Sequence, residues 1–108
     1  MAKKGLSGVT GRRCRAVFSA SDLIGFGVIK ALEVLGKSVP DDISLMGYGD
    51  MPFSNYISLT TVSSPAYEMG KNAMLMLLDL IEGRRVVADK VILRPSIVFR
   101  SSCWQKSE

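Results

Sequence analysis

Histidine is absent from the 108 residues of the sequence, and cysteine is scarce. Without histidine, nucleophilic catalysis by a serine-histidine or cysteine-histidine pair has no base, and a histidine-ligated zinc site is excluded. The two cysteines, Cys14 and Cys103, lie near opposite ends of the chain and lack the spacing of metal ligands. We therefore predict that the protein is not an enzyme and that it uses no metal ion or cofactor.

Long apolar runs are missing as well. The most apolar stretch, Ala73–Leu78, is soon interrupted by Asp79 and Glu82, and it is far shorter than the roughly 20 residues that a membrane-spanning helix needs. Lys3 and Lys4 are not followed by the apolar core or the small-residue cleavage site of a secretory signal. We expect a cytoplasmic protein with no membrane partner, in which both cysteines stay reduced.

Acidic residues are missing from the first 15 positions, and this gap accounts for the net charge of +4. The rest of the chain carries nearly balanced numbers of basic and acidic residues. Glycine, serine and threonine interrupt the basic residues, so we predict a flexible basic tail over residues 1–15, with a phosphate-binding arm as the alternative. Residues 103–108 are predicted to form a short polar tail. The basic residues of the first tail are Lys3, Lys4, Arg12, Arg13 and Arg15.

The rest of the sequence shows a pattern of strand, helix and strand. With 47% hydrophobic and 22% charged residues, the whole chain is too apolar for disorder, and this composition predicts one globular unit. The run Ala16–Ala20 is typical of a strand buried on both faces, and Asp22 is placed to cap a helix. Leu23–Leu35 is apolar almost all round, so we expect a helix that is covered on more than one side and ends at Gly36. A second buried strand at Ile43–Tyr48 completes a βαβ unit with parallel strands.

Polar residues follow both predicted strands at their carboxyl ends. Ser21 and Asp22 come directly after the first strand, and the loop Gly49–Ser58 leaves the second. In open α/β sheets, ligands bind outside the carboxyl ends of the strands. We therefore predict that Ser21–Asp22 and Gly49–Asp50 are neighbours on one edge of the sheet.

The sequence of the second half of the chain predicts another helix between extended segments. A serine followed by proline is typical of a helix start, with the hydroxyl as cap and proline in the first turn. The helix is amphipathic, and Gly83 marks its end. The predicted elements are an extended piece at Leu59–Val62, a cap at Ser64–Pro65, a helix from Pro65 to Glu82, and two further extended pieces at Val91–Leu93 and Ile97–Phe99.

Three motifs in a fixed order resemble the lactose-repressor (LacI/GalR) family of transcription factors. Residues 16–27, AVFSASDLIGFG, resemble the family segment AVFAANDLIALG, and residues 39–50, VPDDISLMGYGD, resemble VPEDISVVGFDD. Leu59–Val62, followed by Pro65 and residues 68–70, resembles LTTV..P..EMG. The resemblance covers residues 16–102. It implies an α/β fold with a parallel βαβ sheet, as part of a periplasmic-binding-protein-like (type I) fold.

The resemblance implies a sensing function. Family members combine a helix-turn-helix with a two-lobed core that binds a small, sugar-like effector between its lobes and dimerises. Residues 16–102 are similar to the C-terminal part of that core, so we interpret them as a partial effector-binding and dimerisation domain of a repressor. DNA is then expected as a partner only through a helix-turn-helix that these residues do not include. The second helix is expected to pack on the other lobe, so we predict a homo-oligomer, with exchange of segments between chains as one form.

The resemblance also implies candidate site residues. The family often has asparagine where this chain has Ser21, and many members have an aspartate at Gly49 that grips the effector. Asp22 is interpreted as a helix cap or a site residue, and Asp50 as a site or turn residue. The candidate effector-binding residues are Ser21, Asp22, Tyr48, Gly49, Asp50, Ser64 and Ala66, and the candidate dimer-interface residues are Phe26, Ile29 and Tyr56.

Other functions are compatible with parts of the pattern. A sugar-binding protein of a transporter would share the fold, although the missing signal and the LTTV motif disfavour it. A magnesium-dependent phosphoryl-transfer or receiver domain would use Asp22 and Asp50 at the strand ends, but the nearest lysines, Lys30 and Lys37, lie far along the helix. The chain could also lack ligand-binding activity of its own.

Overall fold

The computed structural model describes residues 14–84 and 90–104. The tails predicted at residues 1–15 and 103–108 therefore lie mostly outside the described residues. The chain divides into two compact units. The first contains the chain up to Ser63 and from Ile97 onward, and the second is Ser64–Ser96.

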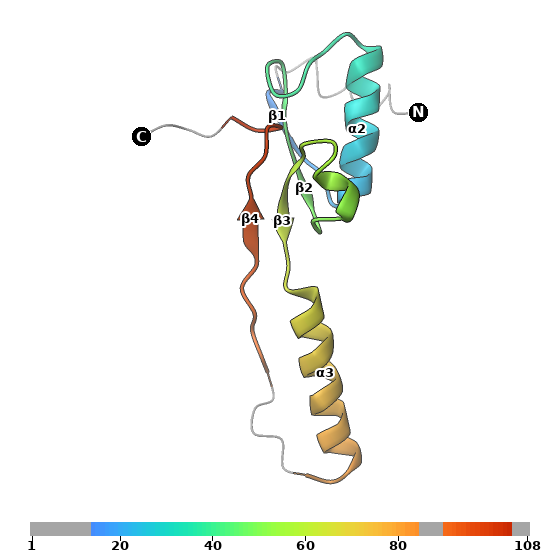
Figure 1. Cartoon of the computed structure of the whole chain (residues 1–108), viewed down its shortest axis with the longest axis vertical. Helices are drawn as coiled ribbons and strands as arrows, with labels where there is room; N and C mark the ends of the chain where they lie inside the picture. Colours follow the sequence, from blue (N-terminus) through green and yellow to red (C-terminus); the bar gives the residue numbers. More distant parts are fainter. Residues whose placement is uncertain (1–13, 85–89, 105–108) are drawn as a thin grey trace. The chain divides into compact units, whose positions relative to one another are not determined.

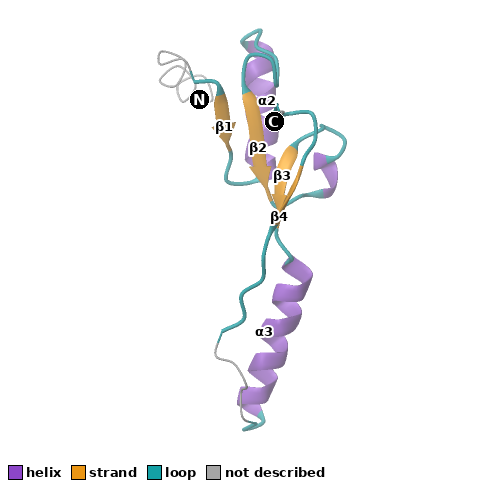
Figure 2. Cartoon of the chain, turned by 90° about the vertical axis from the view of Figure 1, so that its left-hand side faces the viewer, coloured by secondary structure: helices purple, strands orange, loops and turns teal. Residues whose placement is uncertain are grey.

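The first unit is built on the predicted βαβ arrangement. β1 (Ala16–Phe18) and β2 (Ser44–Tyr48) are parallel and are connected by α2 (Asp22–Val34). β3 (Thr60–Ser63) is parallel to β2, and β4 (Ser96–Val98) completes the sheet in the order β1-β2-β3-β4. Figures 1 and 2 show β1, β2 and β3 side by side, with α2 along one face of the sheet. The α/β fold class and the parallel βαβ unit are confirmed.

Helix α2 begins with a different cap from the one we predicted. Ser21 has an extended backbone, with φ −151° and ψ 160°, and its hydroxyl accepts the N–H of Ile24 at 3.2 Å. The prediction that Asp22 caps the helix was wrong, because Asp22 is already the first helical residue and its side chain turns inward. The predicted stop is confirmed, since Gly36 follows the helix with φ +70°.

The apolar core lies between α2 and one face of the sheet. Leu32 and Ile43 form its buried centre. The half-buried residues packed on that centre come from β1, from α2 and from the loop before β2, and they are Val17, Val28, Ala31 and Val39. Leu45 and Leu59 are also fully buried.

Two burial predictions were wrong for the described chain. Phe18 of β1 is 62% exposed, and Leu23 and Ile24 of α2 are 68% and 54% exposed. Within residues 14–84 and 90–104, α2 covers only one face of the sheet and β1 is an edge strand, so β1 is not buried on both faces. The same arrangement leaves one side of α2 facing solvent.

The second unit is dominated by α3 (Ala66–Ile81). Pro65 is its N-cap and makes no side-chain capping bond, so the prediction that Ser64 caps the helix was wrong. The ψ of 66° at Pro65 is not helical, and the helix therefore starts one residue later than predicted. No residue of α3 is buried. Of the two predicted extended pieces, Ile97–Phe99 overlaps β4 (Ser96–Val98), whereas Val91–Leu93 is not part of a strand.

Candidate functional site

The carboxyl edge of the sheet brings together the two polar segments that follow β1 and β2. The N–H of Ser19 donates to the carbonyl of Met46 at 2.8 Å, which joins the end of β1 to β2. Beyond the strands, the N–H of Met51 donates to Oδ2 of Asp22 at 2.9 Å. The predicted proximity of Ser21–Asp22 and Gly49–Asp50 is therefore confirmed. Figure 1 shows the short helix η1 (Pro52–Ser54) beside the first turn of α2.

Asp22 is fully buried at this edge, and both of its carboxylate oxygens are bound. Oδ1 accepts the hydroxyl of Thr61 at 2.6 Å. Oδ2 accepts the hydroxyl of Ser54 as well as the Met51 N–H. A carboxylate without such donors would be costly to bury. Asp22 therefore joins α2 to η1 and to β3.

The surroundings of Asp22 keep it ionised. Burial by itself raises the pKa of Asp22. The hydrogen bonds from Ser54, Thr61 and Met51, together with the positive charge of Arg100, act in the opposite direction and hold the pKa below its ordinary value. The contribution of Asp22 to stability is therefore present above its unfolded pKa of about 3.9 and is lost as the pH falls through the lower folded value.

Gly47 of β2 provides the space that Asp22 occupies. A Cβ on Gly47 would lie far inside van der Waals contact with Oδ1 of Asp22 and 3.0 Å from Cδ2 of Leu59. Both neighbours are fully buried, so neither has open space to move into. The glycine in the middle of this strand is therefore required by the close approach of Asp22.

The turn at Gly49 and Asp50 carries the chain away from β2. Gly49 has φ +120° and Asp50 has φ +51°, both in the region that L-residues other than asparagine and aspartate rarely adopt. The N–H of Gly49 donates to the carbonyl of Val62 at 2.8 Å, and the N–H of Asp50 lies 3.4 Å from Oγ1 of Thr61. The turn is thus attached to β3 at two points.

Arg100 binds the side chain of this turn, and the sequence analysis did not identify it. One guanidinium nitrogen contacts Oδ1 of Asp50 at 2.9 Å, and the other donates to the carbonyl of Leu59 at 2.9 Å. The Arg100 side chain is only 17% exposed. Its one signal in the sequence is a lone cation directly after the apolar run Ile97–Phe99.

Comparison with known proteins identifies the family of the chain. A family model described as a periplasmic binding protein-like domain matches residues 2–103, nearly the whole chain. The chain belongs to the periplasmic binding protein-like domain family. Its curated relatives include the HTH-type transcriptional regulator MalR of Streptomyces coelicolor, which is 38% identical over 98 residues. The HTH-type transcriptional repressor CytR of Escherichia coli is 33% identical over 89 residues.

Solved structures show the same fold. A LacI family transcriptional regulator from Lactobacillus casei with bound sucrose is 42% identical, with a TM-score of 0.70 over 82% of this chain and 33% of its own. The transcription regulator CcpA of Lactococcus lactis is 25% identical, with a TM-score of 0.85 over 95% of this chain and 39% of its own. These matches confirm the resemblance to LacI-type regulators.

This periplasmic binding protein-like domain matches only part of each relative. It spans 28% of MalR and 26% of CytR, while 89% and 81% of this chain are aligned. The matched region corresponds to part of the effector-binding core of LacI-type regulators.

The remaining candidate effector residues of the periplasmic binding protein-like domain differ in their setting. Ser21 is partly exposed and Tyr48 is 42% exposed at the carboxyl edge. Ser64 and Ala66 belong to the second unit. Effector contacts by all of these residues stay predictions.

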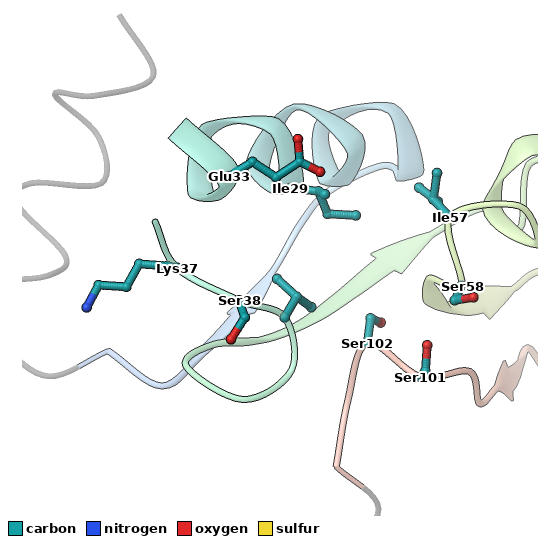
Figure 3. Close-up of a pocket in the computed structure, with 9 residues that line it drawn as sticks. Ile29, Glu33, Lys37, Ser38, Ile57, Ser58, Ser101 and Ser102 are labelled. Atoms are coloured by element: carbon teal, nitrogen blue, oxygen red, sulfur yellow. The ribbon is translucent and has the colours of Figure 1, made fainter. Parts of the chain in front are cut away.

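A cavity lies at the opposite, amino edge of the same sheet in this periplasmic binding protein-like domain (Figure 3). Its volume is about 300 Å³, and its lining residues come from the end of α2 and from the segments before β2, before β3 and after β4. They are Ile29, Glu33, Lys37, Ser38, Val39, Ile57, Ser58, Ser101 and Ser102. In the described residues, every buried side-chain nitrogen and oxygen has a partner. The cavity therefore offers no unpaired buried group to a ligand.

The predicted dimer-interface residues differ in their setting. Ile29 lines this cavity, and Tyr56 is 87% exposed. The ring of Phe26 packs edge-on against Phe53, with centroids 6.2 Å apart, and Nζ of Lys30 lies 5.5 Å from the Phe26 centroid. A role in dimerisation stays a prediction for all three.

The described part of the periplasmic binding protein-like domain comprises residues 14–84 and 90–104. There, no three histidine, cysteine, aspartate or glutamate residues are grouped so that they could hold a metal ion. No helix among those residues has the length and apolarity to span a bilayer.

Proposed function

We propose that this chain forms the C-terminal part of the effector-sensing and dimerisation core of a LacI-type transcriptional regulator. The supporting observation is that Ser21 and the Gly49–Asp50 turn lie on the same carboxyl edge of a parallel sheet. That edge is where ligands bind in open α/β folds. In the regulator, DNA is reached through a helix-turn-helix outside these residues, and this part of the chain performs no catalysis.

The charges at the edge favour a neutral, hydroxyl-rich effector. Asp22 is buried among protein donors, and the carboxylate of Asp50 is neutralised by Arg100. The described residues of the carboxyl edge therefore offer the hydroxyl of Ser21 and the aromatic ring of Tyr48, and no unpaired charge. A hydroxyl suits the polar groups of a sugar, and an aromatic ring suits its apolar face. Similar regulators were solved with sucrose and with cellobiose, which supports this class.

The same contacts disfavour the magnesium-dependent alternative. Each oxygen of Asp22 accepts at least one hydrogen bond, and Arg100 occupies the carboxylate of Asp50. A magnesium ion would have to compete with these donors for the two carboxylates. The transporter alternative is disfavoured because the curated relatives named above are transcriptional regulators.

Ser21→Ala is expected to weaken sugar binding by about two- to tenfold, because one hydrogen bond contributes about 0.5–1.5 kcal/mol. Calorimetric titration with sucrose, glucose and cellobiose measures the affinity. Since Ser21 also caps α2, Ser21→Asn is the matched variant, because asparagine keeps the cap and offers an amide to the sugar. Ser101→Ala at the amino edge is the control. Equal loss in Ser21→Ala and Ser101→Ala, or no sugar binding in any variant, would contradict the proposal.

We also propose that the chain self-associates. α3 has no buried residue, and its side chains at least half exposed include Met69, Met74, Leu75, Leu80 and Ile81. Exposed apolar surfaces of this kind mark interaction sites. Light scattering is expected to give the mass of a dimer or larger species, and Leu80→Glu is expected to lower it while Lys71→Glu on the same helix leaves it unchanged. A monomer at high concentration would contradict the proposal.

A further inference from the structure

Asp22 connects three segments that are distant in the sequence. Asp22 lies in the first turn of α2. Its hydrogen-bond donors are Met51, directly before η1, Ser54 in η1, and Thr61 in β3. All of these bonds converge on one carboxylate that has no exposed surface. Removing this single group would leave two hydroxyls and one N–H at the edge without their acceptor, which is costly in a buried site.

Thr61 connects Asp22 to the Gly49–Asp50 turn through hydrogen bonds. Its hydroxyl has one hydrogen, and an ionised carboxylate can only accept, so that hydrogen is directed to Asp22. The lone pairs of Oγ1 are then free to face the N–H of Asp50, which lies 3.4 Å away. Because Asp22 is ionised, the hydroxyl of Thr61 donates to Asp22, and the N–H of Asp50 donates to the hydroxyl oxygen of Thr61.

Asp50 has a left-handed backbone, with φ +51°. This region costs most non-glycine residues about 1–2 kcal/mol, and although aspartate tolerates it better, the contacts around Asp50 hold it in this conformation. The N–H of Asp50 is held through Thr61, and its carboxylate is held by Arg100, which is itself bound to the carbonyl of Leu59. The turn is thus fixed at its backbone and at its side chain by separate contacts.

We propose that Asp22 is a positioning residue that, through Thr61 and Met51, holds the Gly49–Asp50 turn at the carboxyl edge beside Ser21. Asp22 does not touch the effector, because it is buried behind the turn. Its influence on effector binding rests on the proposed function, whereas its hold on the turn does not.

Thr61→Val and Thr61→Ser separate positioning from packing. Valine keeps the shape of threonine but has no hydroxyl, and serine keeps the hydroxyl. Hydrogen exchange at the Asp50 amide, followed by NMR, is expected to become roughly tenfold faster in Thr61→Val and to stay close to wild type in Thr61→Ser. Equal exchange rates in the two variants would overturn the proposal.

A pH titration of the unmodified chain provides a test that needs no Thr61 variant. The amide resonances of Asp50 and Met51 are expected to move together as Asp22 is protonated, with a midpoint below the ordinary aspartate pKa of about 3.9. Asp22→Asn is expected to abolish this shared transition. Amides that do not respond in the wild type, or that respond equally in Asp22→Asn, would overturn the proposal.

The effect on the effector is measured separately. Thr61→Val is expected to weaken sugar binding at least threefold, whereas Val28→Ala, a core change distant from the edge, leaves the affinity unchanged. Equal weakening in both variants would mean a merely structural role and would contradict the link to binding. If the wild type binds no sugar, the proposed function fails, while the amide measurements still decide whether Asp22 holds the turn.

Discussion

Gly47→Ala is expected to lower the free energy of unfolding by about 1–3 kcal/mol, the range of overpacked cores. The added methyl group would collide with Oδ1 of Asp22 and press on Leu59, and both of these side chains are fully buried. To relieve the collision, Asp22 would have to move away from its hydroxyl and N–H donors. The variant is therefore expected to lose sugar binding along with stability. Urea unfolding followed by circular dichroism measures the first effect.

Gly27→Ala is the matched control for this prediction. Nothing lies within 4 Å of a Cβ at Gly27, which is in the middle of α2. Alanine is favoured over glycine inside a helix by about 1 kcal/mol, so this variant is expected to be more stable than the wild type. If both substitutions changed the free energy of unfolding in the same direction, the account that Asp22 needs the space left by a missing side chain at Gly47 would be contradicted.

Leu32→Ala is expected to destabilise the protein by about 2–5 kcal/mol, the range for large-to-small changes in a core. Leu32 has no exposed surface and lies at the centre of the one cluster that joins α2 to the sheet. Because the described strands are short, few other contacts can compensate for the cavity. The midpoint of urea unfolding should fall with little change in its slope.

Leu23→Ala on the same helix is the control for Leu32→Ala. Leu23 is 68% exposed, and changes at such positions usually stay within about 0.5 kcal/mol. Measurement at low protein concentration keeps self-association from covering Leu23. If both variants lost equal stability, the core would not lie where the structure places it.

The arrangement of the carboxyl edge could be predicted because it depends on local patterns. Two apolar runs separated by a helix define parallel strands, and parallel strands bring the residues after them to one edge. Ser21 and Gly49 are therefore placed by the order of elements alone. The end of α2 at Gly36 could be predicted for the same reason, because glycine adopts the positive φ of a helix end without help from distant residues.

The roles of Asp22 and Arg100 could not be predicted in this way, because they depend on distant contacts. An aspartate at a helix start is explained by capping alone, yet its partners here are 29 to 39 residues away in the sequence. Arg100 lies 50 residues from Asp50. The exposure of Phe18 was missed for a related reason, since an apolar run does not show how many faces of its strand are covered.

Chemical-shift mapping of a sugar on the isotope-labelled chain tests the central claim most directly. With sucrose, glucose or cellobiose at millimolar concentration, the largest shifts are predicted at the amides of Ser21, Gly49 and Asp50. Binding by one wall of a cleft is expected to be weak, with a dissociation constant near 1 mM, which corresponds to about −4 kcal/mol. Largest shifts at Ser58 and Ser101, which line the amino-edge cavity, would contradict the account.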